Sequence, residues 1–150
     1  MFIDASAIVG ILHREPEKEV LEQGLDAATT PYCVSPLVMF EASVSLARAK
    51  LTAGGKLRRL PTAQEIEQAQ SAVVAFVRDL GAEEVAISPD IGKLALEAAK
   101  QYGKAVGHPA ELNFGDCFAY ACASSQGVPL LFKGNDFTHT DIPRAGGLAP

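Results

Sequence analysis

The sequence predicts an α/β protein, folded as a three-layer α/β/α sandwich around a central, mainly parallel sheet. Short apolar runs alternate with longer segments in which apolar residues recur every three or four positions along the 150 residues. Strands that alternate with helices favour right-handed crossovers and a parallel sheet covered on both faces. Because no linker, repeat or low-complexity segment interrupts this pattern, we expect residues 1–150 to form a single domain.

Four strands are predicted from apolar runs that are too short for helices and are bounded by turn residues. They are residues 1–4, 31–35, 84–87 and 130–132. A fifth, short edge strand is possible near Ile142 and Pro143. In open parallel sheets, ligands bind outside the carboxyl ends of the strands, so the residues that follow each run are candidates for function.

Six helices are predicted from apolar spacing and from start and stop signals. They cover residues 5–12, 17–25, 36–53, 63–80, 89–102 and a segment that follows a glycine turn at Gly115 and ends before Gly127. Ser-Pro pairs begin the third and fifth helices, with serine as the N-cap and proline at the first helical position. Thr62 and Glu65 have the spacing of a capping box, and Gly54-Gly55 is expected to end the third helix.

The last helix shows the clearest functional signal. One face is predicted to belong to the core, because its apolar residues recur at helical spacing: Phe114, Cys117, Phe118, Ala121 and Cys122. Asp116 lies beside that face. It could simply favour the positive end of the helix dipole. A carboxylate at the edge of a core is nevertheless costly to desolvate unless a cation, a donor or a metal meets it.

Composition limits the possible functions. The formal net charge is −5, so the overall field does not steer the protein to nucleic acid, although phosphate contacts through divalent metal remain possible. No apolar run approaches the roughly 20 residues of a membrane span, and we expect a cytoplasmic protein with no membrane association. Cysteine and histidine give no metal-site spacing, and the cysteines are expected to be small buried hydrophobic residues. These residues are Cys33, Cys117, Cys122, His13, His108 and His139.

Three further acids occupy positions where such a fold does its chemistry. Asp4 and Asp136 both follow predicted strands, so they should emerge at the same edge as the amino end of the helix that carries Asp116. Glu41 lies among aliphatic residues one and a half turns into the third helix. Each has an ordinary alternative: a helix cap for Asp4, a surface pair with Arg48 for Glu41, and turn chemistry for Asp136.

Together, the four acids predict a metal site. Clustered carboxylates raise one another's pKa values unless a cation joins them, and Lys133 is the nearest candidate side chain. Oxygen ligands favour Mg²⁺ or Mn²⁺ over zinc. A pair of such ions can activate a water and stabilise the leaving oxygen in phosphodiester cleavage.

At these residues the sequence resembles the PIN-domain family, and within it the VapC-type ribonuclease toxins of bacterial toxin–antitoxin pairs. The matching segments are residues 2–6, Glu41, residues 112–117 and residues 134–137. The resemblance implies Asp4 and Asp116 as the principal Mg²⁺ ligands, with Glu41 and Asp136 completing the acidic site. It also implies endonucleolytic RNA cleavage, a homodimer, and inhibition by a small antitoxin.

Substrate contacts outside the acidic site are less defined. Ser6 could hydrogen-bond to whatever Asp4 holds, and a basic cluster over residues 50–59, which includes Arg58 and Arg59, could touch RNA phosphates. Two other functions stay open. One is a signalling receiver that accepts a phosphoryl group on an aspartate, and the other is a catalytically silent PIN-like module that binds RNA or protein.

Overall fold

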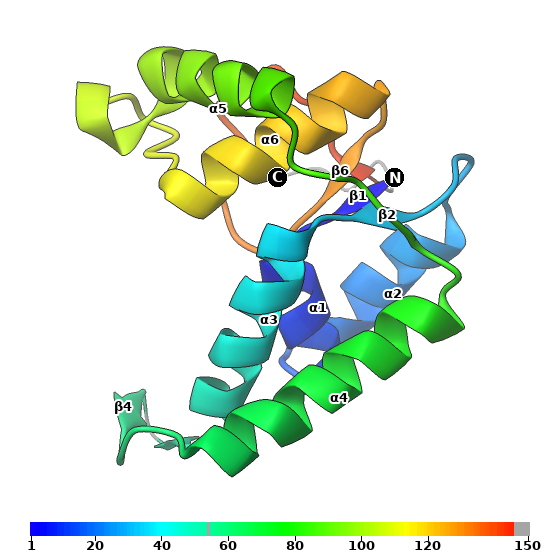
Figure 1. The fold of residues 1–150 in the computed structure, drawn as a ribbon, viewed down its shortest axis with the longest axis vertical. Helices are drawn as coiled ribbons and strands as arrows, with labels where there is room; N and C mark the ends of the chain where they lie inside the picture. The colour runs from blue at the N-terminus through cyan, green and yellow to red at the C-terminus, as the bar shows by residue number, and fades with distance from the viewer. Residues whose placement is uncertain (54, 146–150) are drawn as a thin grey trace.

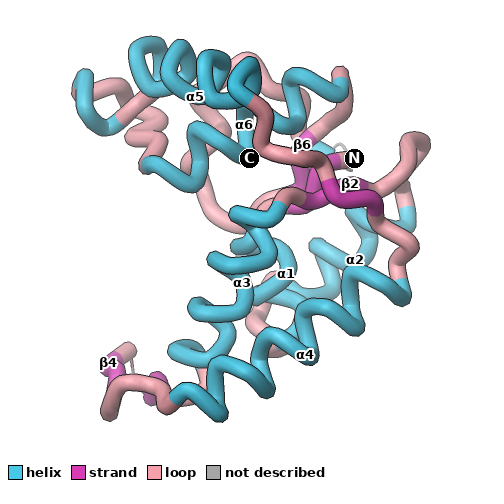
Figure 2. The backbone as a smooth tube through the Cα atoms, in the orientation of Figure 1, coloured by secondary structure: helices cyan, strands magenta, loops and turns pink. Residues whose placement is uncertain are grey.

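The computed structural model describes residues 1–53 and 55–145. A four-stranded sheet lies between two groups of helices, with α5 and α6 on one face and α1 to α4 on the other (Figures 1 and 2). Its strand order is β5-β2-β1-β6, and every pairing between them is parallel. The three-layer α/β/α prediction is therefore confirmed.

Each strand of the central sheet is short. The strands are β1 Phe2–Ile3, β2 Cys33–Val34, β5 Glu83–Glu84 and β6 Leu130–Leu131. The three strands β1, β2 and β6 are buried, whereas β5 lies at an edge and its glutamates are exposed. The apolar run at 84–87 thus falls mostly after the paired residues, because an edge strand with one open side does not need to be apolar throughout.

Three of the helices begin where the predicted capping residues Ser35, Thr62 and Ser88 place them. The helices are α1 Ala5–Leu12, α2 Lys18–Asp26, α3 Pro36–Ala49, α4 Ala63–Asp79, α5 Pro89–Tyr102 and α6 Phe114–Gln126, with a short 3₁₀ helix, η1, at Lys104–Val106. The side chains of Ser35 and Ser88 accept hydrogen bonds from backbone N–H groups in the first turns of α3 and α5. Thr62 and Glu65 form the predicted capping box of α4.

Two predictions about helix boundaries were wrong. Helix α3 ends at Ala49, and the chain then forms a β-hairpin of β3 Thr52–Ala53 and β4 Lys56–Leu57. Part of the segment that carries the basic cluster is therefore paired backbone. Gly54 itself lies outside the described residues. Gly115 is not a turn before α6 but part of its first turn, because the helix already begins at Phe114 after the N-cap.

The core is built on β1 and its neighbours. Phe2, Ile3, Ile8 and Leu46 are fully buried, and all three cysteines are buried with them, as predicted. Phe114 is the exception, because it is exposed although its spacing placed it on the core face. Burying side chains of this size contributes about 1.5–3 kcal/mol each, so the centre of the sheet is a stable base for the loops at its carboxyl edge.

The chain after β6 returns to the sheet. The backbone N–H of Leu130 donates to the carbonyl of Pro143 at 2.9 Å, and Leu130 and Arg144 form an isolated parallel bridge. The possible edge strand near Ile142 is therefore a single bridge in the part that the structure describes. Within residues 1–53 and 55–145, no helix is both long enough and apolar enough to span a membrane.

Candidate active site

Asp4 is the first residue after β1, and the fold buries it at the carboxyl edge of the sheet. One carboxylate oxygen, Oδ2, accepts hydrogen bonds from the backbone N–H of Ser6 at 2.8 Å and from its hydroxyl at 2.5 Å. These bonds make Asp4 the N-cap of α1. Since they use only Oδ2, the other oxygen is left to face the pocket, so capping and ligand binding are compatible at this residue.

Ser6 links the segment after β1, which carries Asp4, to the segment after β6, which carries Asp136. Its hydroxyl donates to Asp4 and accepts from the backbone N–H of Lys133 at 3.0 Å. The bond spans 127 residues of sequence. Because the hydroxyl is already used in both directions, Ser6 is better suited to positioning Asp4 than to contacting a substrate directly.

Asp116 occupies the third position of α6 and is 8% exposed. It forms a capping box with Asn113: the Asn113 side chain accepts from the N–H of Asp116, and Oδ2 of Asp116 accepts from the N–H of Asn113 at 2.8 Å. The helix-start explanation and the site explanation are again compatible, because one oxygen of the carboxylate caps the helix and the other is free of that bond.

Glu41 reaches the pocket from α3, where its side chain is partly buried. A Cβ atom at Gly115 would lie 2.5 Å from Oε2 of Glu41. The absence of a side chain at Gly115 therefore lets the carboxylate lie against the first turn of α6. In the described part of the chain, Glu41 forms no ion pair with Arg48, the surface partner that the sequence left open.

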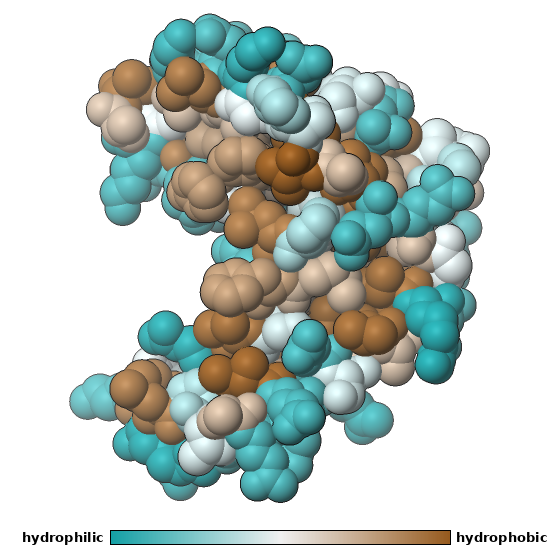
Figure 3. All heavy atoms as spheres, viewed as in Figure 1, coloured by the Kyte–Doolittle hydropathy of each residue, from teal (hydrophilic) through white to brown (hydrophobic). Residues whose placement is uncertain are grey.

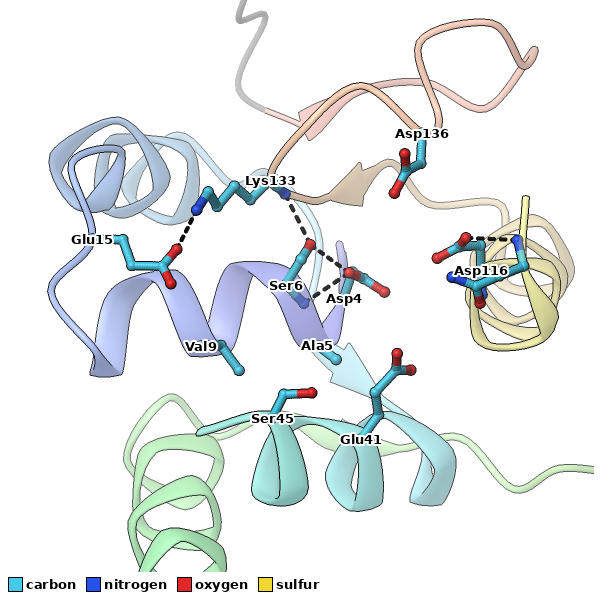
Figure 4. A pocket seen from close by; sticks show the side chains of 11 residues that line it. Asp4, Ala5, Ser6, Val9, Glu15, Glu41, Ser45, Asp116, Lys133 and Asp136 are labelled. Atoms are coloured by element: carbon cyan, nitrogen blue, oxygen red, sulfur yellow. Dashed lines mark hydrogen bonds and ion pairs between the residues drawn. The ribbon is translucent and has the colours of Figure 1, made fainter. Parts of the chain in front are cut away.

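All four predicted acids line one pocket of about 310 Å³. Figure 4 shows Asp4, Glu41, Asp116 and Asp136 directed toward its centre from β1, α3, α6 and the turn after β6. Asp136 is exposed, whereas Asp4 and Asp116 are buried. The acids therefore come from segments separated by most of the chain, and the parallel sheet brings them together.

Burial and mutual repulsion raise the pKa values of three of these carboxyls, Asp4, Glu41 and Asp116. Burial is the main reason that the pKa of Asp116 rises from its ordinary value of 3.8 to about 6, and the charges of Asp4, Asp136 and Glu41 raise it further. The pKa of Asp4 is raised by burial, against the hydrogen bonds from Ser6, and that of Glu41 by burial and by Asp4. The pocket is therefore unfavourable for four negative charges without a cation.

Lys133 does not supply that cation. Among the described residues it is the only basic side chain that lines the pocket. Its ammonium nitrogen Nζ forms an ion pair with Glu15 and lies 3.4 Å from Oε2 of Glu17. Figure 4 shows its ammonium group directed away from the four acids toward Glu15. The charge of Lys133 is thus largely neutralised at the rim, and the acids keep their repulsion.

The donor set fits a hard divalent cation such as Mg²⁺, because it consists of carboxylate oxygens that lack a counter-charge. As the side chains stand, no three acidic, histidine or cysteine side chains in residues 1–53 and 55–145 lie close enough to hold one ion together. Asp4 and Asp116 are fixed by hydrogen bonds, whereas Glu41 and Asp136 have more freedom. A bound ion would therefore have to draw the freer side chains inward.

Sequence reasoning missed three contributors to this site. Asn113 caps the helix that holds Asp116, and the Asn-x-x-Asp spacing was the signal for it. Gly115 makes room for Glu41, and Glu15 holds Lys133 away from the acids. The last two had no sequence signal, because both depend on which helices lie side by side. Arg58 and Arg59 line a different pocket beside the hairpin, and Arg59 pairs with Glu65.

With this geometry established, the chain can be compared with known proteins. The profile of the PIN domain matches residues 1–143. The chain belongs to the PIN-domain family. A VapC ribonuclease of Rhizobium meliloti (strain 1021) is 48% identical over 142 residues, covering 94% of this chain and 98% of that protein. Ribonuclease VapC42 of Mycobacterium tuberculosis is 34% identical over 142 residues, covering 95% and 96%.

The fold of this PIN domain also has a solved counterpart. The crystal structure of Mycobacterium tuberculosis VapC20, described as a sarcin–ricin loop cleaving toxin, superposes with a TM-score of 0.67 at 17% identity. The superposition covers 94% of this chain and 95% of that one. At this identity the likeness concerns the fold alone, which agrees with the PIN-like α/β/α prediction.

Proposed function

We propose that this PIN domain is a Mg²⁺-dependent endoribonuclease and the toxin of a toxin–antitoxin pair. The observation that carries the proposal is the convergence of Asp4, Glu41, Asp116 and Asp136 on one pocket. Carboxylates that repel one another and lack a counter-charge favour a divalent ion. The names of the VapC relatives, which are ribonucleases, support the same reaction.

In this mechanism Asp4 and Asp116 would hold Mg²⁺, or Mn²⁺ in its place, and Glu41 and Asp136 would complete the site. When bound, the ion stabilises the negative charge that develops on the phosphate. Ser6 and Asn113 keep the two principal carboxylates in place through their hydrogen bonds. Glu41, whose pKa is raised by burial, is suited to accepting a proton from the attacking water.

The same proposal includes partners and location. An RNA strand is the substrate, and a small antitoxin covers the site. The chain forms a single domain, and two copies associate as a homodimer in the cytoplasm. The receiver alternative is less well supported, because Lys133 pairs with Glu15 and not with the acids. A silent PIN-like binding module remains the alternative that an activity assay must exclude.

The test is RNA cleavage by the purified protein. We expect cleavage with Mg²⁺ or Mn²⁺, none in EDTA, and a loss on the order of 100-fold or more in Asp4→Asn and Asp116→Asn. Asp90→Asn is the matched control, because Asp90 is an exposed carboxylate in the first turn of α5 that pairs with Lys93. Full activity in both site variants would contradict the proposal, and RNA that is bound but never cut would indicate the silent module.

A further inference from the structure

Two aromatic side chains near the acidic pocket are largely exposed to solvent, so the core does not account for their presence. Phe40 is 68% exposed and Phe114 is 70% exposed. Phe40 directly precedes Glu41 on α3, and Phe114 precedes Asp116 by two residues on α6. Single exposed aliphatic residues are ordinary, but two largely exposed phenyl rings beside one carboxylate site indicate a binding surface.

Both rings belong to residues that adjoin the acidic pocket in the chain, although neither ring lines that pocket. Glu41 and Gly115 are in contact range, and Phe40 and Phe114 are their immediate neighbours in the chain. Phe40 lines an apolar groove between α3 and α4, and Phe114 lines another between α5 and α6. Figure 3 shows hydrophobic side chains along the hollow between the α5–α6 part and the α3–α4 part of the molecule.

The charge of this region shows what kind of attraction is available to a nucleic acid strand. The chain carries a net charge of −5, and among the described residues only Lys133 contributes a positive charge to the lining of the acidic pocket. That charge is already paired with Glu15 and Glu17. Besides Lys133, Lys104 lines the α5–α6 groove beside Phe114, so few basic side chains can reach phosphates here. A term that does not depend on charge would therefore add to the attraction that a bound divalent ion supplies.

We propose that Phe40 and Phe114 are stacking platforms for the two RNA bases that flank the phosphate entering the acidic pocket. This inference rests on the proposed nuclease function. Aromatic faces accept any base, and each stacked base typically contributes severalfold to affinity. The Phe114 ring is held in place by Phe118, with ring centroids 4.9 Å apart and an angle of 55° between the rings. The platform on α6 is therefore ordered before the RNA binds.

An unpaired RNA strand matches this arrangement of grooves and carboxylates. The two rings lie in separate apolar grooves, and the carboxylates of Glu41 and Asp116, which follow the rings by one and two residues, line the acidic pocket. Asn113 is shared by the acidic pocket and the α5–α6 groove, so the two are continuous. In a nucleic acid strand each phosphate lies between two bases, so one strand can present bases to the grooves and a phosphate to the acidic pocket.

The experiment compares leucine and tryptophan at each position. With a short unpaired RNA, Phe40→Leu and Phe114→Leu should each raise KM at least about fivefold with kcat little changed, whereas Phe40→Trp and Phe114→Trp should keep KM near that of the wild type. Val106→Ala is the matched control, because Val106 is 57% exposed on η1 and lines none of the three pockets.

A second measurement changes the RNA instead of the protein. Removing one base beside the cleaved bond should raise the KM of the wild type by the same factor as one leucine substitution does. It should raise the KM of that leucine variant no further. Equal KM for leucine variants and wild type, or equal loss in leucine and tryptophan variants, would overturn the stacking proposal. If leucine leaves RNA kinetics unchanged but alters the oligomeric state, the rings contact a protein surface.

Binding of uncut RNA separates this inference from the proposed function. Fluorescence anisotropy in an Asp116→Asn background should show the same at least fivefold weakening for each leucine variant. If the wild type cuts RNA and the leucine variants bind it as tightly as the wild type does, the stacking role is wrong and the nuclease function stands. A wild type that cuts nothing with Mg²⁺ or Mn²⁺, while leucine still weakens binding, would sink the nuclease proposal and leave the stacking role standing.

Discussion

Replacing Asp116 by asparagine should inactivate the protein and also stabilise its metal-free form. The carboxyl of Asp116 has a pKa of about 6 in the fold, against an ordinary value of 3.8. At about 1.4 kcal/mol per pKa unit, ionising it in the folded state at neutral pH lowers the free energy of unfolding by up to about 3 kcal/mol. Asparagine removes the charge and keeps an oxygen that can accept from the N–H of Asn113.

The pH dependence follows from the sign of this shift. Because the folded pKa is raised, the unfolded chain releases the proton first, so stability falls as pH rises through 3.8 and levels off above about 6. In EDTA, Asp116→Asn should therefore be more stable than the wild type at pH 7.5, by up to about 3 kcal/mol, and the difference should shrink toward zero below about pH 4.

Urea unfolding in EDTA across this pH range measures the effect, with Asp90→Asn as the control. Asp90 is exposed, so its replacement should change stability by less than about 0.5 kcal/mol at any pH. Added Mg²⁺ should stabilise the wild type more than Asp116→Asn, because only the wild type keeps the full ligand set. The reasoning would be refuted if Asp116→Asn were less stable than the wild type at pH 7.5. It would also be refuted if the difference in free energy of unfolding between the two proteins did not change with pH.

Three further substitutions test how the acids are held. Gly115→Ala should push the carboxylate of Glu41 aside and slow RNA cleavage at least about tenfold. It should change stability by no more than about 1 kcal/mol, because alanine favours the helix and the side chain it meets is flexible; cleavage rates and urea unfolding check both. Asn113→Ala should lower stability by about 1 kcal/mol in thermal unfolding, through the lost cap. Ser6→Ala should lower stability by about 1–3 kcal/mol and reduce cleavage, because Asp4 loses the hydroxyl hydrogen bond that helps position it.

Each of these substitutions has a control. Gly92→Ala places the same change in α5, where a Cβ meets open space, so its urea unfolding shows the effect of alanine on helix stability alone. Asn113→Ser keeps a capping oxygen and should recover most of the lost stability. Ser71→Ala removes an exposed hydroxyl on α4 and should be nearly neutral. Unchanged cleavage in Gly115→Ala would show that the position of Glu41 is unimportant for the reaction.

Local patterns in the sequence were sufficient for most of the fold. The Ser-Pro starts of α3 and α5, the capping box of α4 and the strand–helix alternation depend on neighbouring residues only, and all were predicted. The end of α3 was not, because Thr52–Ala53 and Lys56–Leu57, which follow it, form a hairpin whose pairing is a contact between two segments. The exposure of Phe114 was missed for a similar reason: helical spacing defines a face but not what lies opposite it.

The candidate site divides in the same way. The sequence by itself determined that Asp4 and Asp136 follow strands and that Asp116 lies near the start of a helix, since these are statements about position along the chain. Only the tertiary structure decided that Glu41 lies against Gly115 and that Glu15 neutralises Lys133. The reason is physical: hydrogen-bond caps and apolar periods act over three or four residues, whereas the charge and space around a carboxylate are set by elements that meet only when the sheet has formed.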